Sequence, residues 1–190
     1  MTEQTTKKRP VWFWELFEPG QHGAGRDLAA LRAGLGRDAW SVPEMWRLYR
    51  AEIPEDQARR GTVTPALEAE HATLTLFALH QQSMAKSMHA KGPDLGVALF
   101  RLRQSEQFRD HPEALDQRVG AAATATSTKE LVYHLRGLVT LLRGQSIPLD
   151  YNRLHRDIRD WDTPEGRIRV RQAWGISYFV WRASEKPEAE

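Results

Sequence analysis

The chain has 190 residues, of which 41% are hydrophobic and 27% charged, a balance that is typical of a globular protein and argues against wholesale disorder. It has no cysteine, which excludes disulfides, thiolate zinc sites, iron–sulfur clusters and cysteine nucleophiles. The formal net charge is only +2 although 27 residues are basic, so the positions of the charges must indicate the partner. Because no apolar run approaches the ~20 residues that span a bilayer, and the N-terminus lacks an apolar signal core, we expect a soluble, cytoplasmic protein that contacts no membrane.

Helix signals dominate the first half of the chain. Three short helices separated by glycine and proline come first, at residues 11–17, 25–36 and 41–53. Thr64 then has the N-cap position and Pro65 the first helical position of a longer segment, whose apolar residues recur every three or four positions up to Met88. The sequence Lys-Gly-Pro at 91–93 ends this pattern. The spacing therefore predicts one long helix from residue 65 to about residue 90.

Helix-start signals continue in the second half. They consist of a capping residue or a proline in the first turn, and they occur at Asp94, Pro112, Ser127, Asp150 and Thr163. The sequence Arg-Ile-Arg-Val-Arg at 167–171 alternates like a strand, but it lies within a longer helical pattern, so we expect a helix there as well. The sequence predicts an all-α protein of about eight or nine helices in two packed helical bundles.

We place the boundary between the two bundles at the Gly-Pro break near residue 93. The small, polar segment 121–128 is the alternative boundary. The predicted parts are a flexible N-terminal tail, an N-terminal helical half, a C-terminal helical bundle and a flexible C-terminal tail, at residues 1–9, 10–93, 94–183 and 184–190 in that order.

The helix predicted over residues 127–144 carries a pattern of its own. Ser127 and Glu130 have the spacing of a capping box, and Gly144 is expected to end the helix in the left-handed conformation. The basic residues of this helix recur every seven positions and are Lys129, Arg136 and Arg143. They lie about 10 Å apart along the axis, on a line roughly 120° from the leucine seam, and no acidic residue interrupts that line.

The charge around this line is unevenly distributed. Residues 118–156 contain six basic residues and two acidic ones, a local excess of +4 that is larger than the net charge of the whole chain. Such a patch is the expected electrostatic footprint of nucleic-acid binding. The alternative is a solvated helix face, and Arg153 and Arg156 each have an acidic residue four positions on with which they can pair. Arg136 and Arg143 have none, so they are the better candidates.

No segment matches a catalytic or metal-binding signature. There is no P-loop, and the Gly-rich sequence at 20–25 has no strand before it, so we interpret it as a helix connector. His71, His80 and His89 are nine residues apart, which would place neighbours on opposite faces of the predicted helix. The segment 160–166 begins like a calcium loop, but the glutamate that closes such a loop is missing. We therefore expect a protein that is not an enzyme and holds no metal or cofactor, with a metal-dependent nuclease as a minor alternative.

The order of the motifs resembles a known family. An aromatic N-terminal segment is followed by GRDLAALRAGLG at 25–36, AEHATLTLFALHQQS at 69–83 and LGVALFRLRQSE at 95–106. The most specific part is the C-terminal block, with PLDYNRLHRDIRDW at 148–161 and RVRQAWGISYF at 169–179. In these motifs the chain resembles the CasB family, the small subunit of the type I-E CRISPR surveillance complex, Cascade.

The resemblance implies an all-helical, non-enzymatic protein of two bundled halves. Two copies would sit head to tail in Cascade, next to its backbone and large subunits and beside the guide RNA and its DNA target. The resemblance further implies RNA and DNA binding without sequence preference, which stabilises the R-loop and the displaced strand in antiviral defence. This function agrees with the charge pattern of the 127–144 helix, because sequence-blind binding requires contacts to phosphates.

The nucleic-acid contacts of the family can be carried over to matching places in this chain. Together with the charge line, the places near the start of the 25–36 helix, at the end of the long helix and along the last helices give nine candidates: Arg26, Arg32, Lys86, Arg118, Lys129, Arg136, Arg143, Arg153 and Arg156. The alternative is a purely structural helical adaptor between Cascade subunits that has no direct nucleic-acid contact. Its basic line would then pair with acidic protein surfaces.

Overall fold

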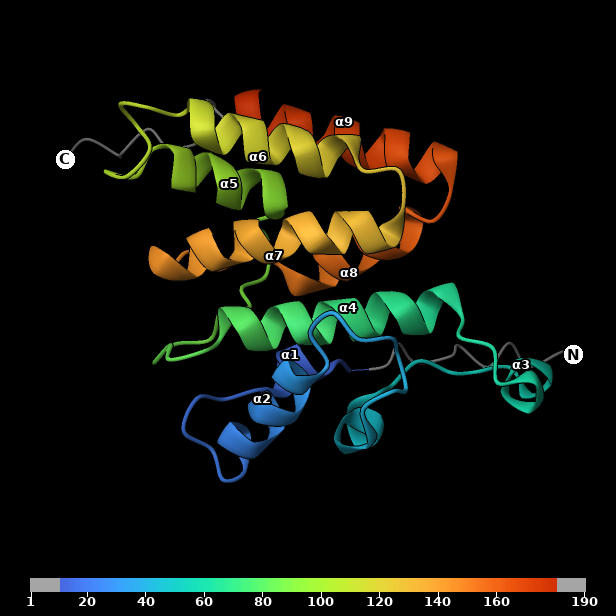
Figure 1. Ribbon diagram of the computed structural model, residues 1–190. Coiled ribbons are helices and arrows are strands. Elements are labelled where there is room, and N and C mark those ends of the chain that lie inside the picture. Colours follow the sequence, from blue (N-terminus) through green and yellow to red (C-terminus); the bar gives the residue numbers. More distant parts are fainter. Residues whose placement is uncertain (1–10, 181–190) are drawn as a thin grey trace, which may run out of the picture.

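The computed structural model describes residues 11–180, so the predicted tails at 1–9 and 184–190 lie outside the described residues. The described part contains nine α-helices, one 3₁₀ helix and no β-strand (Figure 1), which confirms the predicted all-α fold. In chain order the helices are α1 (Phe13–Leu16), α2 (Ala24–Ala33), η1 (Pro43–Leu48), α3 (Glu55–Arg60), α4 (Pro65–His80), α5 (Leu95–Arg103), α6 (Glu113–Thr124), α7 (Thr128–Gly144), α8 (Tyr151–Asp160) and α9 (Pro164–Val180). Among them, none combines the length and hydrophobicity that crossing a membrane requires.

Helix α4 lies between the N-terminal helices and the rest of the described chain (Figure 1). It packs against α2 on one side and against α7 and α8 on the other, and 12 of its 16 residues are therefore buried. Helices α5, α6 and α9 cover the far side of the α7–α8 layer. Buried apolar residues from all these layers form one continuous core. The division of the chain near residue 93 stays a prediction.

The predicted helix starts are confirmed at the N-caps of α4, α5 and α8. At each of these ends a side-chain oxygen accepts a hydrogen bond from a backbone N–H of the first turn: Thr64 from Leu67 at 3.0 Å, Asp94 from Val97 at 2.9 Å, and Asp150 from Asn152 at 2.9 Å. These bonds satisfy N–H groups that have no partner inside the helix, and each stabilises its helix by about 1 kcal/mol. The segment 167–171 is helical within α9, as expected.

The ends of α7 differ in detail from the prediction. The Ser127 hydroxyl accepts from Glu130 N at 3.2 Å, but the Glu130 carboxylate accepts from Thr126 N at 2.8 Å, so the capping box is shifted by one residue. Gly144 belongs to the helix, and Ser146 takes the left-handed conformation with φ 53°. The N–H groups of residues 146 and 147 donate to the carbonyls of residues 143 and 142, which is the Schellman pattern of helix termination.

The predicted long helix is wrong beyond residue 80, because α4 ends at His80 and a loop follows. The buried Gln81 side chain organises this loop. Its Nε2 donates to the carbonyls of Met84 at 3.1 Å and Lys86 at 2.9 Å, and its Oε1 accepts from Met88 N at 2.8 Å. Met88 is buried although it is not helical, so the apolar spacing continued past the true helix end. The prediction failed because a continued helix and the observed loop would both bury Met88, so the apolar spacing does not distinguish them.

Helix α3, a short helix at Glu55–Arg60, was not predicted from the sequence. Its signals are a glycine directly after the last residue and two acid–arginine pairs four residues apart. Its side chains are mostly exposed and none is buried, so the apolar periodicity that revealed the other helices is absent here.

Candidate nucleic-acid interface

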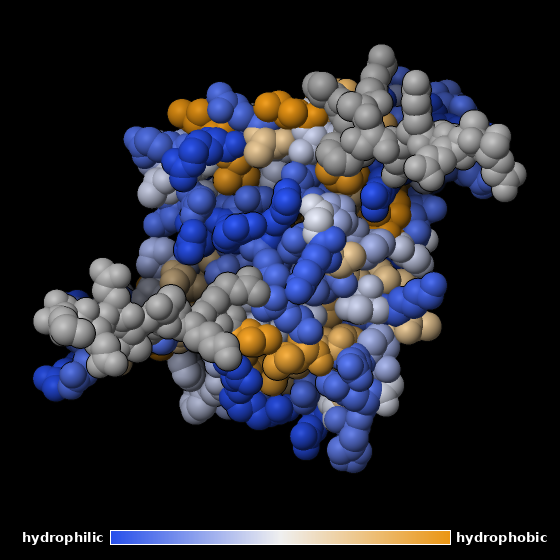
Figure 2. Space-filling view, turned by 180° about the vertical axis from the view of Figure 1, so that it is seen from behind, coloured by the Kyte–Doolittle hydropathy of each residue, from blue (hydrophilic) through white to orange (hydrophobic). Residues whose placement is uncertain are grey.

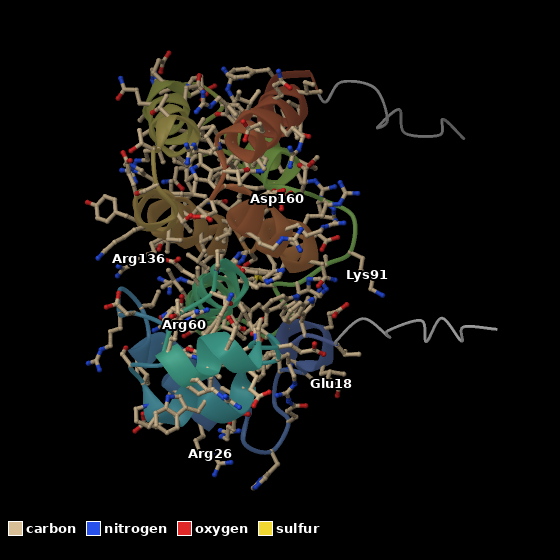
Figure 3. All side chains as sticks on the ribbon, turned by 90° about the vertical axis from the view of Figure 1, so that its right-hand side faces the viewer. Glu18, Arg26, Arg60, Lys91, Arg136 and Asp160 are labelled. Carbon is tan, nitrogen blue, oxygen red and sulfur yellow. The ribbon has the colours of Figure 1, made fainter. Side chains whose placement is uncertain are left out.

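Helix α7 exposes one face along its length on the side of the molecule that is in front in Figure 1. Its leucine seam is fully buried against α4, α5, α6 and α8, as predicted from the spacing. The opposite side of the helix carries Lys129, Tyr133 and Arg136. Figure 3 shows Arg136 at the left edge of the molecule, pointing outwards from α7.

A hollow of about 530 Å³ lies between α7, α4 and the loop at residues 36–39. We call it the α4–α7 hollow. Its apolar lining includes Ala72 from α4 and Val132 from α7. Its cationic lining consists of Arg37, Lys129 and Arg136. An apolar floor with more cations than carboxylates around it suits a ligand that has both an apolar part and a negative charge.

A second hollow of about 650 Å³ lies between α7 and α6, and we call it the α6–α7 hollow. Arg118 from α6 lines it, together with apolar residues such as Leu35 and Leu141. Tyr133 and Arg136 line both hollows, so these two side chains form the ridge between them. The basic residues of two helices and one loop thereby gather on one continuous surface, which we call the α7 surface and which consists of Arg37, Arg118, Lys129, Tyr133 and Arg136.

The cations on this surface are not neutralised by any of the residues that the structure describes. Arg37, Arg118, Lys129 and Arg136 form no ion pair with any residue between 11 and 180. Two acidic residues, Asp38 and Glu68, also line the α4–α7 hollow. The surface keeps an excess of positive charge that is free to bind an anion.

Arg136 owes part of its position to a glycine. Gly36 has φ 75°, which favours glycine, and a Cβ atom at this position would lie 3.0 Å from Arg136 Nη1. The guanidinium therefore lies directly over the loop between α2 and η1. Any larger residue at position 36 would have to displace it.

Arg143, the third member of the predicted line, is engaged inside the protein. Its Nη1 donates to the Leu79 carbonyl at 3.3 Å and to Gln82 Oε1 at 2.9 Å, at the C-terminal end of α4. A cation is favourable there because the last carbonyls of a helix carry partial negative charge. Arg143 thus ties α7 to α4 and is less available to an external anion than Arg136.

Arg153 and Arg156 lie on a different side of the molecule. They share the outer face of α8 with Asp160, and Figure 3 shows Asp160 on the α8 side, away from Arg136. Figure 2 shows this other face, where hydrophilic side chains cover the middle at the height of α8. The arginines of α7 and α8 are close in the sequence but do not form one patch, because the two helices expose opposite sides of the molecule.

The ion pairs expected on α8 do not form. Arg153 lies 3.8 Å from both Asp94 and Asp150, at two helix N-caps. Arg156 has no ion pair with any residue in the range 11–180. Its expected partner Asp160 pairs with Arg159 and Arg169 instead, at 3.0 and 3.6 Å. The Asp157 carboxylate accepts a hydrogen bond from Trp174 Nε1 at 2.8 Å.

The remaining candidates lie away from the α7 surface or contribute little to it. Arg26 is exposed near the start of α2, 3.9 Å from Asp27, and Figure 3 shows it at the lower end of the molecule. Arg32 is half-buried on α2, and Lys86 is exposed in the loop after α4. Of the nine predicted residues, the structure brings Arg118, Lys129 and Arg136 together and leaves the others at separate places.

Two residues of this surface, Arg37 and Tyr133, were not predicted from the sequence. Arg37 follows Gly36 in a loop, where no periodicity indicates which side chains face a helix elsewhere in the chain. Tyr133 had a usable signal, because it is four residues after Lys129 and three before Arg136 and therefore shares their face.

Three histidines, His71, His80 and His155, are buried in the protein core. Burial lowers the pKa of His80 to about 3 and that of His155 to about 4, so both are neutral at physiological pH. His89 lies in the loop and not on α4, so the expectation that His80 and His89 lie on opposite faces of one helix is wrong. The rings of His80 and His89 both contact Tyr151. Between residues 11 and 180, no three His, Asp or Glu side chains are arranged to hold a metal ion.

The fold and the α7 surface together define an all-helical protein whose cations on one outer face have no ion pair among the described residues. Residues 27–179 match the family model of the CRISPR-associated protein Cse2. The crystal structure of CasB from Thermobifida fusca is 35% identical, with a TM-score of 0.64 over 82% of this chain and 84% of that chain. The chain therefore belongs to the Cse2 family, also called CasB, and the resemblance seen in the sequence is confirmed.

More distant structures share the fold. The crystal structure of CasB from Thermus thermophilus is 23% identical, with a TM-score of 0.62 over 85% of this chain and 90% of that chain. A chain of a structure described as a CRISPR RNA-guided surveillance complex is 24% identical, with a TM-score of 0.59 over 80% of this chain and 81% of that chain. Among curated protein sequences, none matches the chain.

Proposed function

We propose that this chain is a non-catalytic small subunit of a type I-E CRISPR Cascade complex. In this proposal it binds nucleic acid without sequence preference and stabilises the guide RNA–target R-loop and the displaced strand in antiviral defence. Its partners are the backbone and large subunits, a second copy of itself placed head to tail, the guide RNA and the DNA target. Membership of the Cse2 family supports the assembly, as does the similarity to a chain of an RNA-guided surveillance complex.

One observation carries the nucleic-acid part of the proposal, namely that four cations without ion pairs in the described chain gather around two adjacent hollows on one face. Arg118, Lys129 and Arg136 come from two helices and Arg37 from a loop, so the fold has to bring them together. Clustered arginine and lysine side chains suit phosphate groups, which carry no sequence information. The face therefore fits a strand of any sequence.

A second observation favours protein contacts on another side. Ile168, Ile176 and Phe179 on α9 are 53%, 63% and 61% exposed and lie on the same side of the helix. Figure 2 shows apolar groups at the height of α9, above the hydrophilic band. We assign this α9 face to neighbouring subunits, because an exposed apolar row on one helix is typical of a protein interface. A purely structural adaptor would use this face for protein contacts and would pair the cations of the α7 surface with acidic protein surfaces.

Fluorescence anisotropy with labelled oligonucleotides of unrelated sequence separates the two functions. For the double variant Lys129→Ala/Arg136→Ala we expect weaker binding to every sequence, and a slope of log K against log salt that is shallower by about 1.4 for single strands, since two phosphate contacts are lost. The matched control is Arg59→Ala/Arg60→Ala, which removes the same charge from α3, where both arginines already pair with acids.

The control variant should bind like the wild type. Absence of binding by the wild type at low salt would contradict the nucleic-acid function and favour the structural adaptor. Equal losses of oligonucleotide affinity in both double variants would mean that binding depends on the net charge of the protein and not on the α7 surface. Incubation of the same oligonucleotides with Mg²⁺ or Mn²⁺ should leave them intact, and cleavage would contradict the non-catalytic assignment.

A further inference from the structure

Tyr133 is a large aromatic side chain at the centre of the outer face of α7. Its exposed fraction is 70%, and its hydroxyl forms no hydrogen bond with any residue between 11 and 180. The single ring contact that it makes there is edge-on, with the neighbouring His134 at 5.3 Å. One exposed aromatic residue is ordinary on a protein surface. Tyr133 differs because it stands on the ridge between two hollows, with Lys129 and Arg136 on either side of it along the helix.

The α4–α7 hollow beside this ridge has the size and the lining of a ligand site. Its volume of about 530 Å³ falls in the range of roughly 300–1,000 Å³ that is usual for ligand pockets. Ala72, Thr75 and Val132 provide a largely apolar floor. Around it lie three cations and the two carboxylates of Asp38 and Glu68, so the cations are in excess. The apolar part favours a flat group with little charge, whereas the cations favour phosphates.

A nucleotide of an unpaired strand has both parts, a flat base that can stack on an aromatic ring and a phosphate on each side of it. A base inside a duplex cannot enter, because it is stacked and paired. We infer that Tyr133 and the α4–α7 hollow form a site for one unpaired nucleotide of a single strand, in which the base stacks on Tyr133 while Lys129 and Arg136 bind the flanking phosphates. This inference rests on the proposed nucleic-acid function and adds to it a preference for single strands.

The test uses the full-length protein and fluorescence anisotropy with three probes of equal length: a single strand of mixed sequence, the same backbone with abasic sites, and the blunt duplex. Tyr133→Ala should weaken binding of the single strand at least fivefold, the lower limit for the loss of one stacked base. It should leave the salt slope unchanged, because no charge is removed. Tyr133→Phe should bind like the wild type, since the ring is retained.

The other probes distinguish stacking from a structural effect. Duplex binding should not change in Tyr133→Ala, and the abasic strand should bind the wild type and Tyr133→Ala equally. The matched control is Phe179→Ala, which removes an exposed aromatic ring from α9 and should alter none of these affinities. Circular dichroism melting checks that each variant is folded, which is expected because Tyr133 is not part of the core.

Two results overturn the inference alone and leave the proposed function intact. In the first, Tyr133→Ala binds the single strand like the wild type while Lys129→Ala/Arg136→Ala binds it more weakly. In the second, Tyr133→Ala loses affinity for the single strand, the duplex and the abasic strand to the same degree. A wild type that binds none of the three probes overturns both, and it would assign the α7 surface to an acidic protein segment.

Discussion

The Asp157 carboxylate offers a test of the packing between α8 and α9 that is independent of any ligand. It lies largely shielded from solvent and accepts a hydrogen bond from Trp174 Nε1 at 2.8 Å. Burial raises its pKa from 3.8 to about 7, the Trp174 hydrogen bond opposes this rise, and the nearby Asp94 charge adds to it. The substitution Asp157→Asn removes the charge and retains an oxygen that can accept from Trp174.

The sign of the effect follows from the two states of the protein. The unfolded chain ionises Asp157 near pH 4, whereas the folded chain keeps it protonated up to about pH 7. Between these values the folded state binds the extra proton, so this residue lowers the free energy of unfolding as the pH rises, and the loss is complete above about pH 7. The difference between the two pKa values corresponds to at most about 4 kcal/mol. Since part of the residue still reaches solvent, we expect a smaller effect of about 1–3 kcal/mol.

Urea denaturation of the wild type and of Asp157→Asn at pH 4.5, 6 and 8 measures this difference. The variant should match the wild type near pH 4.5 and exceed its stability by about 1–3 kcal/mol at pH 8. Because other ionisable groups titrate in both proteins, their effects cancel in the comparison. A variant that is less stable than the wild type at pH 8, or a difference that is the same at all three pH values, would refute the buried position assigned to this carboxylate.

Two further predictions concern the packing of the helices. Gly96→Ala on α5 should lower the free energy of unfolding by about 1–3 kcal/mol, because the new Cβ would lie 2.7 Å from the Trp174 carbonyl oxygen of α9. Gly120→Ala on α6 is the control and should be neutral or stabilising, because no atom of residues 11–180 outside its own helix would lie within 4 Å of the new Cβ. Chemical denaturation of both variants measures the two changes in stability. Arg143→Ala should cost about 1 kcal/mol of stability, because the bonds to the end of α4 are lost, and should weaken oligonucleotide binding less than Arg136→Ala does. Equal binding losses for Arg143 and Arg136 would show that Arg143 leaves α4 to contact the ligand.

The sequence predicted well what depends on one helix at a time. The position of Lys129 and Arg136 relative to the leucine seam follows from the helical repeat alone, and the structure has it as expected. The N-caps at Thr64, Asp94 and Asp150 were also predictable, because a capping side chain bonds to its own first turn. The all-α fold followed from the sum of such local signals.

What depends on the packing of helices against one another could not be predicted in the same way. Arg153 and Arg156 are near Arg136 and Arg143 in the sequence, but α8 turns its outer face to the other side of the molecule. Arg143 fits the basic line on a helical projection, yet only the position of α4 shows that its guanidinium is already engaged. The α4–α7 hollow exists because three separate segments meet, and no pattern within any one of them reveals it.

Photocrosslinking tests the central claim, that the α7 surface contacts nucleic acid, most directly. A single strand that carries 5-iodouracil is bound to the full-length protein, irradiated and digested with trypsin, and the crosslinked peptide is identified by mass spectrometry. The account predicts a crosslink in the peptide of residues 130–136, which trypsin releases after Lys129 and Arg136 and which contains Tyr133. Crosslinks confined to peptides from α8 or α9, with none from residues 130–136, would contradict it.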